Sequence, residues 1–407
     1  MKHIVLSLFL CASLLSVAQK KDLKAIKEAV EFLAADELEG RETGTKGEKK
    51  AAEFIAGKFK EMQIEPMGTE GYFQNFSVTP KANPHSNNPD TTLAPINGKN
   101  VVGMLNHGAE YTVVIGAHYD HLGVGAEGSL YAGKEPQIHN GADDNASGIA
   151  LMLALAHELG SEKYNGFNYL FIAFSGEEKG LWGSNYYAKN PTIELEKVNY
   201  MINFDMVGRL DTAKGLAING VGTAPNWMEN LEIANETNLK LITSESGVGP
   251  SDHTSFYLVD IPVLHFFTGQ HSDYHKPSDD ADKVNYEGIA TIEKLVLALI
   301  EETEGDGKME FQKTKTEEKD TPRFTVTLGV MPDYMFQGDG MRIDGVTDGR
   351  PASKAGFEKG DIVIQMGEHQ VEGMQSYMQA LSKFKKGDKA MVKVKRGKKE
   401  VESEVTF

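Results

Sequence analysis

The feature that most constrains the fold is an alternation of short β-forming runs with helical patterns, between about residues 22 and 302. Four runs rich in Val, Ile, Phe and Tyr are bounded by Gly, Pro or Asn and predict strands. They cover residues 112–120, 168–178, 198–208 and 261–269. Helical patterns lie before, between and after them. This order predicts βαβ units, and therefore an α/β fold with a doubly wound, mostly parallel sheet flanked by helices. Such sheets bind ligands beyond the carboxyl ends of their strands, so the residues after each strand are the candidates for function.

The pattern changes after the last helix of this region. Residues 303–320 are charged and almost free of large apolar side chains, which indicates a linker. Residues 321–407 show short strands, Gly-rich turns and one short helix at 376–384, and predict a small β-rich domain. We therefore expect a larger domain over residues 19–302 and a smaller one after the linker.

The first residues are typical of a secretory signal peptide. Lys2 precedes an apolar run that ends in the small-residue pattern Ser16-Val17-Ala18, which predicts cleavage after Ala18 and removal of residues 1–18. The apolar run is too short to span a bilayer, and no later stretch reaches the ~18 apolar residues that a span requires. We expect an exported protein, periplasmic or extracellular, with no membrane span. The only cysteine, Cys11, would leave with the signal peptide, so the mature chain would have no disulfide.

The net charge of −17 limits the partners of this chain. A strongly acidic protein is repelled by nucleic acids and by anionic membrane surfaces, so neither is an expected partner. The same acids can supply ligands for a metal ion.

Histidines and acids follow each of the four predicted strands. One histidine in a strand is more often a core residue, and an acid pair such as that in loop 141–148 is often a helix cap. Several acids gathered at one edge of a sheet would repel each other and lose hydration, and a divalent cation removes that conflict. Imidazole and carboxylate ligands suit Zn²⁺ best, with Mn²⁺ or Co²⁺ as alternatives. The candidates, in chain order, are His118, Asp120, Asp143, Asp144, Glu177, Glu178, Asp205, His271 and His275.

Five of these segments, in this order, resemble the motifs of the zinc aminopeptidases of the M28 family. They lie at residues 118–120, 141–148, 174–184, 203–208 and 274–280. The similarity covers about residues 25–302, including the stretch from Arg41 that is typical of the family's N-terminal helices. The resemblance implies two zinc ions per chain as cofactors.

The resemblance also implies which residues bind the two zinc ions. His118 and Asp205 would bind the first ion, and Glu178 and His275 the second. Asp144, at the fourth position of its motif, would bridge both. Two ions held in this way lie roughly 3.5–4 Å apart.

Further roles follow from the resemblance. Glu177 would be the general base, because it stands beside a ligand without being one. Tyr274 would donate a hydrogen bond to the developing oxyanion, although plain packing is an equal alternative. Asp120 would accept the second imidazole N–H of the metal-binding histidine two positions before it. Asp252 and His253, in a further motif, would support the site without binding metal.

Residues 349–373 resemble the core of a PDZ domain of the bacterial type. Leu328, Gly329 and Val330 stand where such domains have their carboxylate-binding loop, whose N–H groups hold a peptide C-terminus. The alternative is a domain that packs against the enzyme as a spacer, since a fold does not fix a function.

The sequence thus predicts an exported di-zinc aminopeptidase that acts on peptides with a free N-terminus. One alternative is a glutaminyl cyclase, a transferase with the same fold and a single zinc. Others are a carboxypeptidase or dipeptidase of the same family, and a non-catalytic binding protein in which the PDZ domain carries the function. The residues that follow the Glu177-Glu178 pair match the aminopeptidase pattern, and a scaffold has no need of a base beside a metal.

Overall fold

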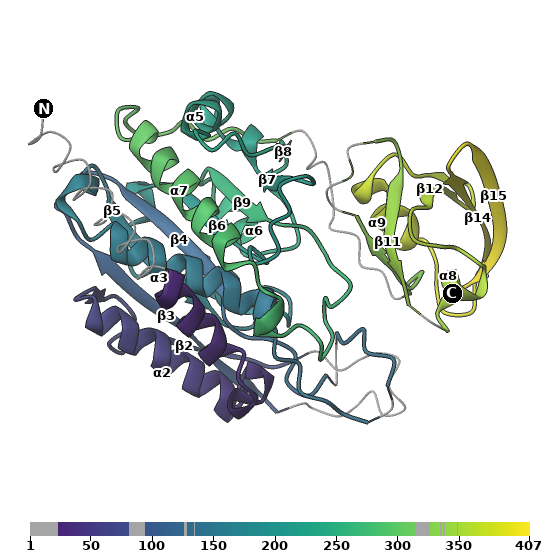
Figure 1. Cartoon of the computed structure of the whole chain (residues 1–407), viewed down its shortest axis with the longest axis horizontal. Coiled ribbons are helices and arrows are strands. Elements are labelled where there is room, and N and C mark those ends of the chain that lie inside the picture. The colour runs from purple at the N-terminus through teal and green to yellow at the C-terminus, as the bar shows by residue number, and fades with distance from the viewer. Residues whose placement is uncertain are drawn as a thin grey trace, which may run out of the picture. The chain divides into compact units, whose positions relative to one another are not determined.

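The computed structural model of the chain describes residues 23–80, 94–125, 128–133, 135–314, 326–333, 336, 338–347 and 349–407. The predicted signal peptide, with its cleavage after Ala18, lies outside the described residues. The chain divides into two compact units (Figure 1). The smaller consists of Leu130–Glu135, Gly269–Tyr274 and Glu317–Phe407, and the larger of the rest. No helix among the described residues is both long enough and apolar enough to cross a membrane.

A mixed sheet forms the middle of the larger unit. Over the described residues it has nine strands, in the order β1-β3-β5-β4-β6-β9-β7-β8, with β2 also paired to β3. The central strands β5, β4, β6 and β9 are mutually parallel. At one edge β3 pairs antiparallel with β5, and β1 and β2 pair antiparallel with β3, whereas β7 pairs antiparallel with β9. The strands are β1 Glu65–Pro66, β2 Phe73–Val78, β3 Ile96–Leu105, β4 Thr112–His118, β5 Asn168–Phe174, β6 Val198–Phe204, β7 Leu216–Asn219, β8 Leu241–Ser244 and β9 Val263–Phe267. The four predicted strands are the four central ones, which confirms the predicted fold class.

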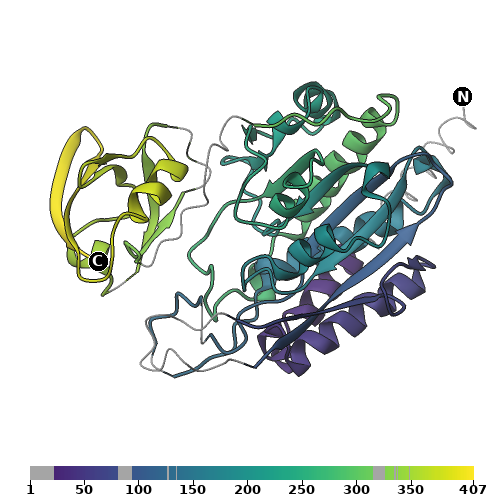
Figure 2. The same ribbon diagram turned by 180° about the vertical axis from the view of Figure 1, so that it is seen from behind.

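Helices cover both faces of this sheet, because successive residues of a strand point to opposite sides. In β4, Val113 and Ile115 pack in a core with α2, α3, α5 and α7, whereas Val114 packs in a second core with α4 and α6. Figures 1 and 2 show the two faces in turn. The α-helices are residues 23–33, α2 Lys46–Glu61, α3 Gly148–Glu158, α4 Trp182–Lys189, α5 Trp227–Ala234, α6 His253–Tyr257 and α7 Tyr286–Thr303. Short helical turns are η1 Asp36–Arg41, η2 Ala142–Ser147, η3 Glu162–Tyr164, η4 Leu195–Lys197, η5 Val221–Thr223 and η6 Ala281–Lys283.

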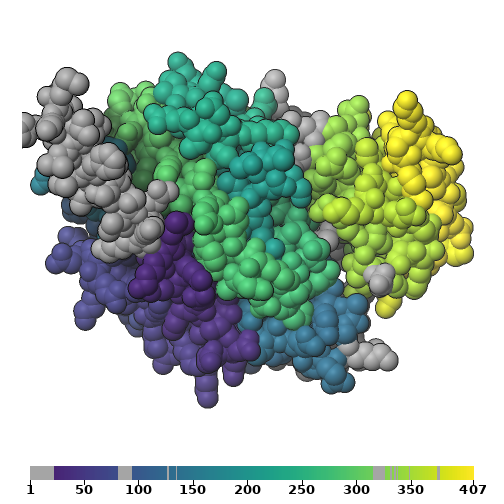
Figure 3. Space-filling view, viewed as in Figure 1, coloured from purple at the N-terminus to yellow at the C-terminus, as the bar shows by residue number. Residues whose placement is uncertain are grey.

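The first described helix lies beside α7 on the outside of the larger unit (Figure 3). The ammonium of Lys27 stands 5.9 Å from the ring centroid of Tyr286, at the start of α7. Ile26 and Val30, on the inner side of the same helix, are buried in the core that α7 also lines. The two ends of the larger unit therefore pack together over one face of the sheet.

The smaller unit has its own antiparallel sheet and its own core. Over the described residues its strand order is β10-β11-β12-β14-β15, with β13 paired to β12. Leu328, Ile343, Val363 and Val392 are fully buried among its apolar residues. The elements are β10 Val330–Pro332, β11 Met341–Val346, α8 Pro351–Lys354, β12 Ile362–Met366, β13 His369–Gln370, α9 Met374–Leu381, β14 Lys389–Arg396 and β15 Lys399–Thr406. This confirms the expected small β-rich domain.

The described part of the predicted linker, residues 303–314, packs on the larger unit. Met309 is buried, and its backbone N–H donates to the side-chain oxygen of Asn199 at 2.7 Å. The backbone N–H of Thr314 donates to the hydroxyl of Tyr257 at 3.1 Å. A truncation that separates the two units should therefore retain residues up to 314.

Candidate active site

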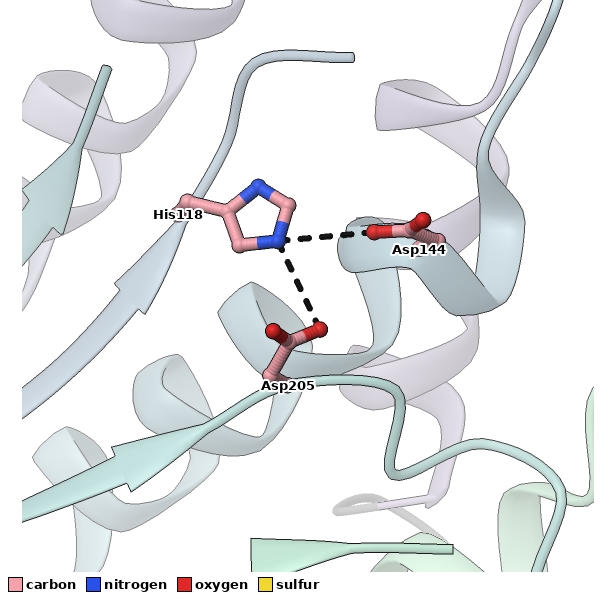
Figure 4. A group of neighbouring side chains, drawn as sticks. All are labelled: His118, Asp144 and Asp205. Carbon is pink, nitrogen blue, oxygen red and sulfur yellow. Dashed lines mark ion pairs between the residues drawn. The ribbon is translucent and has the colours of Figure 1, made fainter. Parts of the chain in front are cut away.

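The carboxyl ends of β4 and β6 bring three of the predicted ligands together. His118 is the last residue of β4, Asp205 directly follows β6, and Asp144 belongs to η2. The Nε2 atom of His118 lies 3.4 Å from an oxygen of Asp144 and 3.5 Å from an oxygen of Asp205 (Figure 4). Donor atoms that share one tetrahedral zinc are ~3.3 Å apart, given metal–ligand distances near 2.0–2.1 Å. The spacing of these three donors therefore fits a common zinc ion.

The second oxygen of Asp144 faces another group of predicted ligands. The Nε2 atom of His275 lies 3.2 Å from this oxygen and 3.3 Å from an oxygen of Glu178, which follows β5. The two groups thus share Asp144, with one carboxylate oxygen turned to each. This is the arrangement that a bridging carboxylate requires.

A histidine that the sequence analysis missed stands in the second group. His121 follows β4 by three residues, and its Nδ1 atom lies 2.8 Å from Glu178 and 3.9 Å from Asp144. Its place in the loop after β4 was the available signal, since the residues beyond each strand were the candidates for function. His121, Asp144 and Glu178 together offer a set of donor atoms close enough for one metal ion.

The backbone around Asp144 is held from outside its own loop. One oxygen of the Asp279 carboxylate accepts the backbone N–H groups of Asp143 and Asp144 at 2.9 and 3.1 Å. The Asp143 carboxylate accepts the backbone N–H of Gly208 at 2.6 Å. Asp143 and Asp144 therefore have different roles. Asp143 fixes the loop, and Asp144 is left to face the histidines.

A buried cation that the sequence analysis also missed ties this loop to β4. The guanidinium of Arg41 donates to the backbone carbonyls of Tyr119 at 2.8 Å, Asn140 at 2.6 Å and Gly141 at 3.0 Å. Burial lowers the pKa of Arg41 to about 10, and nearby carboxylates including Asp120 partly oppose that shift. Arg41 fixes the relative positions of the loops that carry the donor groups.

Asp120 supports the site through both its backbone and its side chain. Its backbone carbonyl is 3.2 Å from Nδ1 of His118, closer than its carboxylate at 3.8 Å. The carboxylate instead accepts the hydroxyl of Thr43 at 2.9 Å and the backbone N–H of Glu177 at 3.1 Å. Burial raises the pKa of Asp120 to about 6. Asp120 was predicted to accept the second imidazole N–H of His118, and its backbone carbonyl lies closer to that nitrogen than its carboxylate does.

Glu177 lies at the site in a strongly perturbed environment. Burial raises the pKa of its carboxyl well above the usual range, His118 opposes that shift, and the negative charges of Asp205 and Glu178 add to it. A carboxyl with a raised pKa is well suited to accept a proton and to give it back near neutral pH.

The carboxylates of the site need positive charge beside them, which either protonated imidazoles or a metal ion can supply. Burial would lower the pKa of His118, but Glu177 and Asp205 raise it well above the ordinary value. Burial would likewise raise the pKa of Glu178, but His275 lowers it to about 2. Without metal the imidazoles would therefore hold protons, and a divalent cation would replace them.

The buried atoms of the second group are incompletely paired. Both ring nitrogens of His121 and one oxygen of Glu178 have no hydrogen-bond partner among the described residues. Unpaired buried donors and acceptors cost free energy, so such atoms call for an unseen partner. Imidazole and carboxylate donors in this arrangement fit zinc.

Asp252 and His253 are buried at the start of α6. Burial raises the pKa of Asp252 to about 7 and lowers that of His253 well below its ordinary value. The ring of His253 stacks on that of His265, with centroids 4.5 Å apart. These two residues therefore form a buried polar layer whose supporting role stays a prediction.

The remaining predicted site residues belong to the smaller unit. Tyr274 ends the segment Gly269–Tyr274, where its backbone N–H donates to the carbonyl of His271 at 3.1 Å. Leu328 is buried, Gly329 has a φ of 78°, and Val330 opens β10. A Cβ atom on Gly329 would come within 2.2 Å of the Arg350 side chain, so this turn requires glycine. The functions of Tyr274 and of this loop stay predictions.

The two units match two different protein families. Residues 100–300 match peptidase family M28, and residues 311–407 match the PDZ domain. The larger unit belongs to peptidase family M28. This match confirms the resemblance found in the sequence and the prediction of an enzyme of the peptidase class. The smaller unit belongs to the PDZ domains.

Relatives of this M28 chain include one that is named an aminopeptidase. Aminopeptidase YwaD of Bacillus subtilis is 31% identical over 200 residues, which cover 47% of this chain and 40% of that protein. The chain thus spans less than half the length of this relative.

Two solved structures share the fold of the larger unit. A Zn-dependent exopeptidase from Parabacteroides distasonis has a TM-score of 0.56 at 18% identity, over 68% of this chain and 97% of that chain. A glutaminyl cyclase from Bacteroides thetaiotaomicron has a TM-score of 0.55 at 17% identity, over 68% and 97%. At such identities the likeness establishes the fold alone, and the fold is common to both activities.

Proposed function

We propose that the protein is a di-zinc aminopeptidase that removes residues from the free N-terminus of peptides. The observation that carries this proposal is the pair of histidine–carboxylate groups that share Asp144. Two metals joined by one carboxylate are typical of aminopeptidases and of other hydrolases with two-metal sites. The M28 match and the relative named an aminopeptidase support the same assignment.

In this proposal five residues hold the two zinc ions. His118 and Asp205 bind the first, Glu178 and His275 bind the second, and Asp144 binds both. When bound, the zinc ions polarise the scissile carbonyl and lower the pKa of the attacking water.

Glu177 is the proposed general base. It accepts the proton of the attacking water and returns it to the leaving amine. The hydrogen bond between its backbone N–H and the Asp120 carboxylate fixes the start of the Glu177-Glu178 turn, so the base and the adjacent ligand are positioned together. The hydroxyl of Tyr274 is proposed to donate to the substrate oxygen as negative charge develops there.

The PDZ unit is proposed to bind peptide C-termini at Leu328–Val330. Backbone N–H groups of such a loop hold a carboxylate, while the bound peptide extends the edge of the sheet. We further propose export to the periplasm or the cell exterior, on the signal peptide predicted from the sequence. The enzyme would then trim peptides outside the cytoplasm.

Hydrolysis of a matched substrate set tests the proposed activity. The set has aminoacyl-p-nitroanilides with a free amine, the same compounds N-acetylated, and peptides with an N-terminal glutamine. We expect release from the free-amine substrates, loss of release with a chelator, and recovery on zinc addition, whereas the acetylated controls stay intact. Cyclisation of the glutaminyl peptides without hydrolysis would replace the proposal with a cyclase. Cleavage from the C-terminal side would replace it with a carboxypeptidase.

A further inference from the structure

His121 stands among donors whose spacing fits a single zinc ion. Its Nδ1 atom is 3.9 Å from the Asp144 oxygen that also faces His275, and 2.8 Å from an oxygen of Glu178. His275 is 3.2 and 3.3 Å from the same two carboxylates. The two imidazoles face the same oxygen of Asp144 and different oxygens of Glu178, so both carboxylates lie within reach of both rings. His121, Asp144 and Glu178 offer donor atoms close enough together for one metal ion. The first group offers three such donors, from His118, Asp144 and Asp205.

The ring of His121 forms no hydrogen bond within the part of the chain that the structure describes. The residue is fully buried, and both its ring nitrogens lack a hydrogen-bond partner among the described residues. The Nδ1 atom lies 2.8 Å from an oxygen of Glu178, but this pair does not meet the geometry of a hydrogen bond, and neither atom has another hydrogen-bond partner among the described residues. A shared metal ion satisfies both atoms, which a proton between them in this geometry does not.

The surrounding backbone holds the ring in this position. The backbone N–H of His121 donates to the carbonyl of Arg41 at 3.3 Å. Gly141, with a φ of 56°, passes so close that a Cβ atom there would lie 2.6 Å from Cγ of the His121 ring. The loop that carries Asp144 therefore packs directly on the imidazole, and the two donors are fixed relative to each other.

We propose that His121 is a further ligand of the second zinc, which makes the two metal sites unequal. This inference rests on the proposed di-zinc function. The second ion would have four protein donors, from His121, Asp144, Glu178 and His275. The first would have three and would keep an open position for water or substrate, as catalytic zinc sites do. The second ion would then be held more tightly and would serve to fix Asp144.

Two substitutions of His121 separate ligation from hydrogen bonding. His121→Asp places an oxygen where Nδ1 was, so it can bind zinc but cannot donate a hydrogen bond to Glu178 when ionised. His121→Asn places a donor there, so it can bond to Glu178 but binds zinc poorly. His139→Asn is the matched control, because His139 is an equally buried histidine whose ring nitrogens face Ser129 and the Gln137 carbonyl.

The readout is zinc bound per chain, measured by mass spectrometry of metals after equilibration with a chelator at fixed free zinc. We expect two zincs in the unsubstituted, His139→Asn and His121→Asp proteins. The His121→Asn protein should keep one, with affinity for the second lowered at least ~10-fold. Any other pattern among the two His121 variants overturns the assignment. X-ray absorption at the zinc edge tests the unsubstituted protein directly, where three imidazoles shared by two zincs are expected and only two would contradict ligation. Zinc content does not depend on turnover, so a failure of the proposed peptidase activity would be seen separately.

Discussion

Buried carboxylates are treated differently in the two units. In the PDZ unit the Asp361 side chain is 1% exposed, and its two oxygens accept from Nε and Nη2 of Arg396, each at 2.7 Å. It also accepts the backbone N–H of Glu358 at 2.9 Å. In the peptidase unit Asp144 is also buried, but within the described residues its ion pairs are with histidines only.

The different partners of Asp361 and Asp144 distinguish a carboxylate that stabilises the fold from one that is available to bind a metal. Burial would raise the pKa of Asp361, but the hydrogen bonds from Arg396 lower it below the usual range, so the pair is complete as folded. Among the described residues no lysine or arginine forms an ion pair with Asp144, and its imidazole partners can carry positive charge only when protonated. In the proposed function a divalent ion completes this cluster. Substitutions that alter one unit and leave the other unchanged test this difference between the two carboxylates.

The largest effect is expected from Asp144→Asn. Loss of the shared carboxylate should lower zinc content below two per chain and reduce hydrolysis well beyond the ~10–100-fold typical of an outer partner. Asp143→Asn is the matched control, since its side-chain oxygen can still accept the Gly208 N–H. Metal analysis and initial rates check both variants. Full zinc in the Asp144→Asn protein would show that Asp144 is not the bridge.

A smaller effect on metal, but a large one on rate, is expected from Glu177→Gln. Removal of the base should reduce turnover by ~10²–10⁴ while zinc content stays at two. Its neighbour provides the contrast, because Glu178→Gln should lose zinc as well as activity. Steady-state rates together with metal content distinguish the two acids. Unchanged turnover in Glu177→Gln would remove it from the role of base.

The smallest effect is expected in the PDZ unit, from Asp361→Asn. Loss of the charged pair should lower the free energy of unfolding of this unit by about 1–2 kcal/mol and leave hydrolysis of short substrates unchanged. Because the pKa of Asp361 is lowered in the folded state, its contribution is present above the ordinary aspartate pKa and is lost as the pH falls through the lowered value.

Thermal unfolding of the full chain at pH 7 and below pH 4 measures the effect of Asp361→Asn. The difference between the parent and this variant should shrink at the lower pH. Glu404→Gln is the control, since its ion pair with Lys389 is mostly exposed and should contribute little. A variant as stable as its parent at pH 7 would contradict the account of a completed pair.

The centre of the fold was predictable because it is encoded locally. β4, β5, β6 and β9 are buried along their whole length, so each appears in the sequence as a continuous β-forming run. A parallel sheet brings the ends of such strands to one edge, which is why His118 and Asp205 could be placed together. β7 and β8, of four residues each, carry too short a pattern to stand out.

The residues that the sequence analysis missed act through long-range packing. Asp279 holds the Asp143 N–H from 136 residues away, and Arg41 reaches the Tyr119 carbonyl across 78 residues. His121 meets Glu178 only once β4 and β5 are paired. No local period or spacing encodes such contacts, so they depend on the assembled loops.

The most direct test of the central claim is the number of zinc ions that the metal-free protein binds, counted by native mass spectrometry of the full chain. The account predicts two ions per chain, because two donor groups share Asp144. Binding of one ion would contradict the shared site, and binding of none would contradict the assignment of the buried acids and histidines as a metal centre.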